Sequence, residues 1–131
     1  MNQNKIKVAV LDDDESYACA LERLFRAAGF EVRTYSSAEA FLAAPPLPRP
    51  DCLVLDVHLS GMSGLDLQRQ LRTAGDVAPI IFITADDSTR VREEAEEAAC
   101  SGYFVKPVKR DLIIQAIKKA VGPDTSRSST D

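Results

Sequence analysis

Five short apolar runs, separated by stretches with helical spacing, are the feature that most constrains the fold of this 131-residue chain. The apolar residues of the third and fourth runs are continuous rather than alternating, which is typical of strands covered on both faces. Strand–helix alternation repeated five times requires crossover connections, and these build a parallel sheet between two helix layers. The expected strands are residues 6–11, 31–35, 52–57, 79–84 and 103–105.

Polar residues mark where three of the helices should begin. Ser36 and Glu39 form a capping-box pattern ahead of a short helix, and Ser63 with Asp66 gives the acidic version of the same signal. Asp14 follows the first strand, where a negative charge complements the dipole at a helix N-terminus. The sequence therefore predicts an α/β fold with helices on both faces of the sheet.

Length and composition fit one domain with an ordinary core. Hydrophobic residues make up 45% of the chain and charged residues 27%, as in typical globular proteins. We expect residues 1–122 to form that domain. Residues 123–131 are polar and small, so we expect a disordered tail or the start of a linker.

Charge and hydropathy argue against nucleic-acid and membrane partners. The net charge is −4, no signal-peptide layout opens the chain, and no apolar run approaches the roughly 18 residues of a membrane helix. We therefore expect a cytoplasmic protein that binds neither nucleic acid directly nor membrane. The odd number of cysteines, each with apolar neighbours, predicts three buried free thiols: Cys19, Cys52 and Cys100.

Ionisable and hydroxyl residues follow four of the five strands. Asp12 and Asp13 end the first run, Asp56 the third, Thr84 the fourth and Lys106 the fifth, whereas the second run ends without an ionisable group. A flavodoxin-like strand order, 2-1-3-4-5, leaves the second strand at the edge and brings the other ends together. The sequence therefore predicts a site at the carboxyl edge of a doubly wound five-stranded parallel sheet.

The chemistry of that site follows from its charges. Three carboxylates crowded together repel one another unless a cation neutralises them, and hard oxygen ligands suit Mg²⁺ or Mn²⁺. A metal, a lysine and a hydroxyl together can hold the oxygens of a phosphoryl group. Asp56 stands alone at its strand end, so we expect it to be the nucleophile and to form an acyl phosphate.

Four stretches carry a family resemblance: VAVLDDD, LVLDVHLSGMSG, PIIFITA and GYFVKP. In this order and spacing, each at a strand end, they resemble the response-regulator receiver family, the phosphoacceptor domain of two-component signalling. The likeness extends from residue 6 to about residue 121. Each stretch alone is weakly specific, and the order of all four carries the resemblance.

The resemblance implies a metal site and a phosphoacceptor. Asp56 would accept phosphate from a phosphohistidine on a sensor histidine kinase or a phosphotransfer protein. Asp13 and Asp56 would ligate Mg²⁺ directly, together with the backbone carbonyl of His58, and Asp12 would act through a metal-bound water. Such a domain catalyses its own phosphorylation and slow autodephosphorylation and is not a conventional enzyme.

The resemblance also implies a switch. Thr84 and Lys106 would contact phosphoryl oxygens, Tyr103 would turn inward as Thr84 moves, and the Lys106–Pro107 peptide would be cis. The phosphorylated domain would act through its changed surface on a downstream protein or on a covalently linked output domain. The domain itself would be a monomer or a phosphorylation-dependent dimer.

Two departures from the family pattern stand out, together with two residues at positions that vary in the family. Ser60 occupies a position that is usually proline, and residues 99–102, ACSG, replace a commoner Gly-Ala pattern. His58 and Asp86 lie two residues beyond Asp56 and Thr84, at positions that tune the lifetime of the phosphate in the family.

Two other functions deserve comparison. In a haloacid-dehalogenase-like phosphatase Asp12 would be the nucleophile and Asp14 the acid–base, but Asp56 would have no role and the acidic pair expected after the lysine is missing. In a pseudo-receiver, a pure interaction module, one of the acidic, threonine or lysine positions is usually lost. All of them are present in this chain.

Overall fold

A five-stranded, all-parallel sheet lies at the centre of the computed structural model, which describes residues 5–44 and 49–122. Its strand order is β2-β1-β3-β4-β5, as the sequence predicts. The third strand ends at Leu55, two residues earlier than expected. The strands are β1 (Lys7–Leu11), β2 (Glu31–Tyr35), β3 (Cys52–Leu55), β4 (Ile80–Thr84) and β5 (Gly102–Val105).

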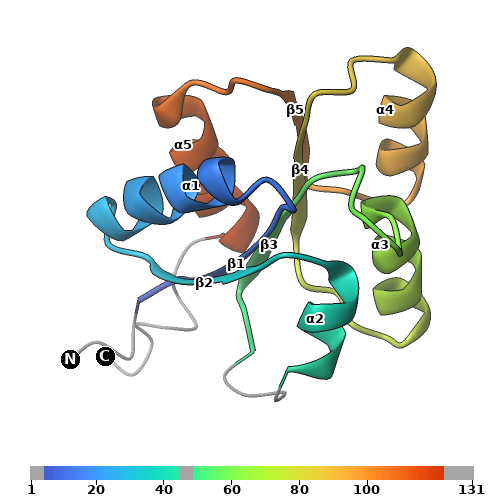
Figure 1. Cartoon of the computed structure of the whole chain (residues 1–131), viewed down its shortest axis with the longest axis horizontal. Helices are drawn as coiled ribbons and strands as arrows, with labels where there is room; N and C mark the ends of the chain where they lie inside the picture. Colours follow the sequence, from blue (N-terminus) through green and yellow to red (C-terminus); the bar gives the residue numbers. More distant parts are fainter. Residues whose placement is uncertain (1–4, 45–48, 123–131) are drawn as a thin grey trace.

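Helices cover both faces of the sheet (Figure 1). Helices α1 and α5 lie on one face, and α2, α3 and α4 lie on the other. The helices are α1 (Glu15–Ala27), α2 (Ala38–Ala43), α3 (Gly64–Thr73), α4 (Thr89–Glu97) and α5 (Arg110–Val121).

Two apolar cores result from the alternation of side chains along each strand. In β1, Val8 and Val10 pack toward α1 and α5, where they join Phe25, which is completely buried. Ala9 and Leu11 point to the opposite face and pack with α2, α3 and α4. Because the central strands are buried on both sides, a polar site built on them must lie at the ends of the strands.

The predicted caps of α1 and α3 are confirmed. The Asp14 side chain accepts a hydrogen bond from the backbone N–H of Tyr17, 3.2 Å away, and so caps α1. The Ser63 hydroxyl accepts from the backbone N–H of Asp66 at 3.0 Å at the start of α3. Each cap satisfies a donor that the first helical turn leaves unpaired.

The predicted cap of α2 is wrong by one residue. Ser37, not Ser36, caps this helix, and its hydroxyl accepts from the backbone N–H of Ala40 at 3.0 Å. Glu39 does not reach back to complete a capping box. Its carboxylate instead accepts from the backbone N–H of Met62 at 2.8 Å, which ties α2 to the loop between β3 and α3.

The three cysteines are free thiols, as expected, but they are not all buried. Cys52 is buried in β3 and Cys100 is half-buried, whereas Cys19 is exposed. Cys19 lies on the outward face of α1, one position beyond the buried Ala18. The prediction that Cys19 is buried is therefore wrong. Apolar neighbours in the sequence do not show which way a helical residue points, because successive helical residues face different directions.

Two further expectations concern the C-terminal tail and membrane-spanning helices. The predicted tail, residues 123–131, lies outside the described residues. Within the part of the chain that the structure describes, no helix is both long and apolar enough to cross a membrane.

Candidate functional site

The register of β1 and β3 places two carboxylates side by side. Leu11 pairs with Leu55, and the next residues are Asp12 and Asp56. The backbone N–H of Asp56 donates to the carbonyl of Leu11 at 3.0 Å, which continues the ladder by one bond. Both aspartates are buried, with 4% and 8% of their surface exposed.

Lys106 joins the two buried carboxylates. Its backbone N–H donates to the carbonyl of Thr84 at 2.8 Å, which fixes the residue at the end of β5. Its Nζ lies 2.9 Å from Oδ2 of Asp12 and 3.0 Å from Oδ2 of Asp56. The same ammonium stands 4.5 Å from the ring centroid of Tyr17, a cation–π distance.

This buried cluster carries more negative than positive charge. Burial raises the pKa of Asp12 even though Lys106 opposes the shift. Burial would lower the pKa of Lys106, but its hydrogen bonds with Asp12 and Asp56 outweigh burial and raise it. Two carboxylates against one ammonium leave about one uncompensated negative charge, so a further cation would stabilise the ionised cluster.

The Asp13 carboxylate has a partner in the loop after β3. Its Oδ2 accepts from the hydroxyl of Ser60 at 2.9 Å and from the backbone N–H of Ser60 at 3.2 Å. Across residues 5–44 and 49–122, no three acidic, histidine or cysteine side chains stand where they could hold a metal ion. Carboxylate oxygens are ligands that Mg²⁺ prefers, and a cation would offset the excess negative charge. In this structure each carboxylate contacts donors of the protein itself.

A chain of contacts leads from Asp56 to Tyr103. The backbone N–H of His58 donates to Oδ1 of Asp56 at 3.0 Å, and Nε2 of His58 lies 2.6 Å from Oδ2 of Asp86. The backbone N–H of Asp86 donates to Oγ1 of Thr84 at 3.3 Å, and its carbonyl accepts from the Tyr103 hydroxyl at 2.8 Å. Asp86 therefore links the loops after β3 and β4 with the aromatic ring of β5.

Tyr103 is turned inward in this structure. The residue is 8% exposed, and its ring lies 6.1 Å from that of Phe82. Burial, followed by the nearby Asp86 charge, raises the pKa of its hydroxyl to about 12. The Lys106–Pro107 peptide is cis, as expected from the resemblance.

Sequence reasoning missed several residues that shape the site. Tyr17 lies on α1 and not at a strand end, yet its ring contacts Lys106. Gly64 has no room for a side chain, since an added Cβ would lie 2.3 Å from the carbonyl oxygen of Asp56. The glycine was visible in the motif HLSGMSG, but only the three-dimensional contact explains it.

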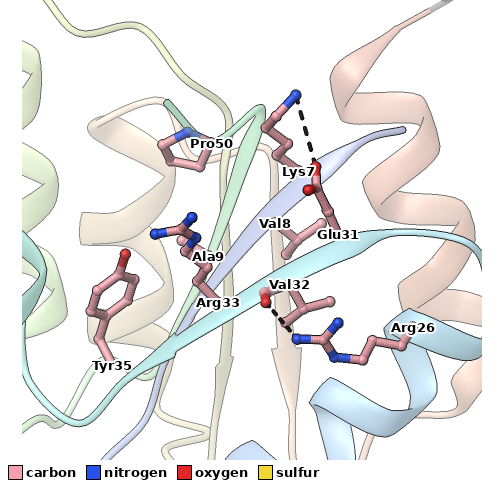
Figure 2. A pocket seen from close by; sticks show the side chains of 9 residues that line it. All are labelled: Lys7, Val8, Ala9, Arg26, Glu31, Val32, Arg33, Tyr35 and Pro50. Atoms are coloured by element: carbon pink, nitrogen blue, oxygen red, sulfur yellow. Dashed lines mark hydrogen bonds and ion pairs between the residues drawn. The ribbon is translucent and has the colours of Figure 1, made fainter. Parts of the chain in front are cut away.

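A cavity of about 250 Å³ lies apart from these residues, against β1 and β2 (Figure 2). Three of its charged groups already have partners, because Lys7 pairs with Glu31 at 3.9 Å and Arg26 donates to the carbonyl of Val32. None of Asp12, Asp56, Thr84 or Lys106 lines this cavity. The strand-end cluster therefore remains the candidate site.

Comparison with known proteins agrees with this geometry. The sequence pattern of the response regulator receiver domain matches residues 8–118. The response regulator protein TodT of Pseudomonas putida is 36% identical over 121 residues, which are 92% of this chain and 53% of TodT. The chain thus spans about half the length of the curated relatives that it matches.

Solved structures give the same result. A response regulator receiver protein from Burkholderia phymatum is 42% identical, with a TM-score of 0.79 over 90% of this chain and 96% of that one. The structure described as FixJ-N is 34% identical, with a TM-score of 0.82 over 89% and 94%. This chain belongs to the response regulator receiver domain family of two-component systems.

Proposed function

We propose that this domain accepts a phosphoryl group on Asp56 from a phosphohistidine of a sensor histidine kinase or a phosphotransfer protein. One observation carries the proposal: the Lys106 ammonium bridges the buried carboxylates of Asp12 and Asp56 at 2.9 and 3.0 Å. Packing alone gives no reason to bury two aspartates beside a half-buried lysine. A phosphoacceptor site uses all three.

The transfer forms a bond between a carboxylate oxygen of Asp56 and phosphorus while the phosphorus–nitrogen bond of the donor breaks. The product is an acyl phosphate, and the donor imidazole, which carries a proton on its other ring nitrogen, takes the electron pair of the broken bond and leaves as a neutral base. Asp12, Asp13, Asp56 and the backbone carbonyl of His58 would hold Mg²⁺. When bound, Mg²⁺ supplies positive charge to the phosphoryl oxygens.

Lys106 and Thr84 serve the transferred group. The Lys106 ammonium, which contacts Oδ2 of Asp56 before transfer, would remain close enough to pair with a phosphoryl oxygen afterwards. The Thr84 hydroxyl accepts from the backbone of Asp86. Because this hydroxyl can still donate its own proton, a new bond from Thr84 to the phosphoryl group would link the modification to the loop after β4.

The phosphatase alternative has little structural support. Its acid–base would be Asp14, but that side chain caps α1 through the backbone N–H of Tyr17. Its nucleophile would be Asp12, whose Oδ1 accepts from a backbone N–H at 2.9 Å and whose Oδ2 contacts Lys106, the same pattern of contacts as at Asp56. The pseudo-receiver alternative predicts no phosphoryl adduct, so the phosphorylation experiment below distinguishes it from the proposal.

Acetyl phosphate with Mg²⁺ tests the proposal. We expect intact-protein mass spectrometry to show one phosphoryl adduct that is stable in acid and labile in base. The adduct should be lost in Asp56→Asn and retained in Asp12→Asn at a reduced rate. An adduct that requires Asp12 instead would support the phosphatase, and no adduct in any variant would support an interaction module.

The output lies beyond this domain. Because relatives such as TodT are about twice the matched length, we propose that residues 1–122 form a receiver that acts on a linked output domain or on a separate downstream protein. Residues 123–131 would begin the linker. Modification of Asp56 would change the surface of α4 and β5, to which Asp86 and Tyr103 connect the site.

A further inference from the structure

The end of α4 is hydrogen-bonded to the neighbouring helix through Gln68 of α3. The side-chain amide of Gln68 donates from Nε2 to the carbonyl of Ala98 at 3.0 Å and to the carbonyl of Ala95 at 3.4 Å. Helices α3 and α4 lie on the same face of the sheet (Figure 1), and Gln68 is completely buried. The last carbonyls of a helix have no partner within it, so Gln68 supplies hydrogen bonds where α4 ends.

The turn that ends α4 adopts a conformation that is unfavourable for its sequence. Ala99 has a φ angle of 67°, in the left-handed region that glycine usually occupies at this position of a helix end. The backbone N–H of Cys100 donates to the carbonyl of Ala95 at 3.1 Å, and the N–H of Ala99 donates to that of Glu96 at 3.0 Å. Because the Cβ of alanine disfavours this conformation, surrounding contacts must hold the turn in place.

The choice of glutamine at position 68 also has a cost. Its Oε1 is buried and has no hydrogen-bond partner among the residues that the structure describes. An apolar side chain of the same length would fill this space without leaving an oxygen unpaired. Stability alone therefore does not explain Gln68, whereas its two bonds to the end of α4 do.

The N-terminal end of α4 is held differently. It adjoins the loop after β4, in which the carbonyl of Asp86 accepts from the Tyr103 hydroxyl. Ser88 caps this end through a long hydrogen bond, 3.4 Å, from the backbone N–H of Val91, whose side chain is buried. The loop that leads from the site thus enters α4 at one end, and Gln68 acts at the other.

We propose that Gln68 is a positioning residue that anchors the end of α4 to α3, so that α4 opens and moves from its N-terminal end. A movement of the loop after β4 would then tilt α4 about its anchored end instead of displacing the whole helix. The anchor goes beyond the proposed function, because it acts in the unmodified chain. Its failure would leave phosphoryl acceptance at Asp56 untouched.

Native-state hydrogen exchange of backbone amides, followed by NMR on the full chain without a phosphoryl donor, tests the anchor. The amide of Cys100 should be protected at least about five-fold more than that of Arg92, which donates to the Ser88 carbonyl in the first turn. This first measurement requires no substitution, so it stands even if a variant fails to fold. Equal protection of the two amides would overturn the proposal.

Gln68→Met keeps the length of the side chain and removes both donated bonds. It should lower the protection of Cys100 about five- to thirty-fold and leave that of Arg92 within about two-fold. An equal loss at both amides would show that Gln68 contributes only general stability, and an unchanged Cys100 would show that it does not hold the turn. Either result would overturn the anchor.

Ala99→Gly is the matched variant in the same turn. Glycine adopts the left-handed conformation without the penalty of a Cβ, so the protection of Cys100 should rise about two- to five-fold while Gln68 stays in place. Lower protection of Cys100 in this variant would contradict a turn that is held against strain. The urea midpoint of each variant checks that the whole domain remains folded.

Discussion

Single residues in this domain are held by short contacts across loops. His58 is the clearest case, because its backbone N–H contacts Asp56 while its ring contacts Asp86. The ring is largely exposed, so this ion pair depends on the charge of both partners rather than on burial. The contact with His58 should therefore change the pH range in which the Asp86 carboxyl titrates.

The Asp86 carboxyl should titrate at unusually low pH. Its hydrogen bond with His58, assisted by the backbone N–H of Ser88, lowers the pKa of Asp86 to about 2. A carboxyl whose pKa falls on folding stabilises the native state above its ordinary pKa of about 4, and this stabilisation is lost as pH falls from about 4 to about 2.

NMR titration of the carboxyl carbon checks this prediction. We expect the pKa of Asp86 to rise toward its ordinary value in His58→Ala. An equal pKa for Asp86 in both proteins would show that His58 does not hold this carboxylate in solution.

At the scale of elements, the start of α3 is packed directly against the end of β3. The backbone N–H of Gly64 donates to the carbonyl of Val57 at 2.8 Å. A Cβ at Gly64 would lie 2.3 Å from the Asp56 carbonyl oxygen and 3.1 Å from the Val57 Cα. Both obstacles are backbone atoms, so the loop that positions Asp56 would have to move.

Gly64→Ala should therefore lower the free energy of unfolding by about 1–3 kcal/mol, the usual range for forcing extra atoms into a packed site. Urea denaturation measures the change. The matched control is Gly102→Ala, in which the new Cβ meets the movable Phe104 side chain at 3.3 Å. A loss of stability in Gly64→Ala no larger than in the control would contradict this account of the β3–α3 junction.

Much of the fold was predictable from the sequence because its signals are local. Continuous apolar runs specify buried parallel strands, and the residues at their ends specify which edge is polar. The cap of α2 was misplaced because Ser36 and Ser37 are adjacent and Glu39 has a partner in another loop. Contacts such as the one between Asp13 and Ser60 join distant segments of the chain, so local sequence patterns do not predict them.

At the scale of the whole molecule, Lys106 connects the site with β5. Its backbone continues the β4–β5 ladder, and its ammonium contacts both buried aspartates. We predict that modification of Asp56 shifts the domain between two arrangements of the same fold, which differ at α4 and β5.

Lys106→Ala should leave Mg²⁺ binding largely intact but separate phosphorylation from conformational change. Without the ammonium, the buried carboxylates depend more on the metal, while a phosphoryl group on Asp56 loses its partner at the end of β5. Amide chemical shifts of β5 and α4, recorded in Mg²⁺ with and without a beryllofluoride phosphate mimic, measure the response. A response of the same size as in the unmodified chain would contradict this role of Lys106.

Fluorine NMR of beryllofluoride binding tests the central claim most directly, because the mimic reports the acceptor carboxylate without phosphate turnover. With Mg²⁺ present, the unmodified chain should show resonances of bound fluoride that are absent without the metal. Asp56→Asn should abolish them. Bound resonances that survive in Asp56→Asn, or that never form in the unmodified chain, would contradict phosphoryl acceptance at Asp56.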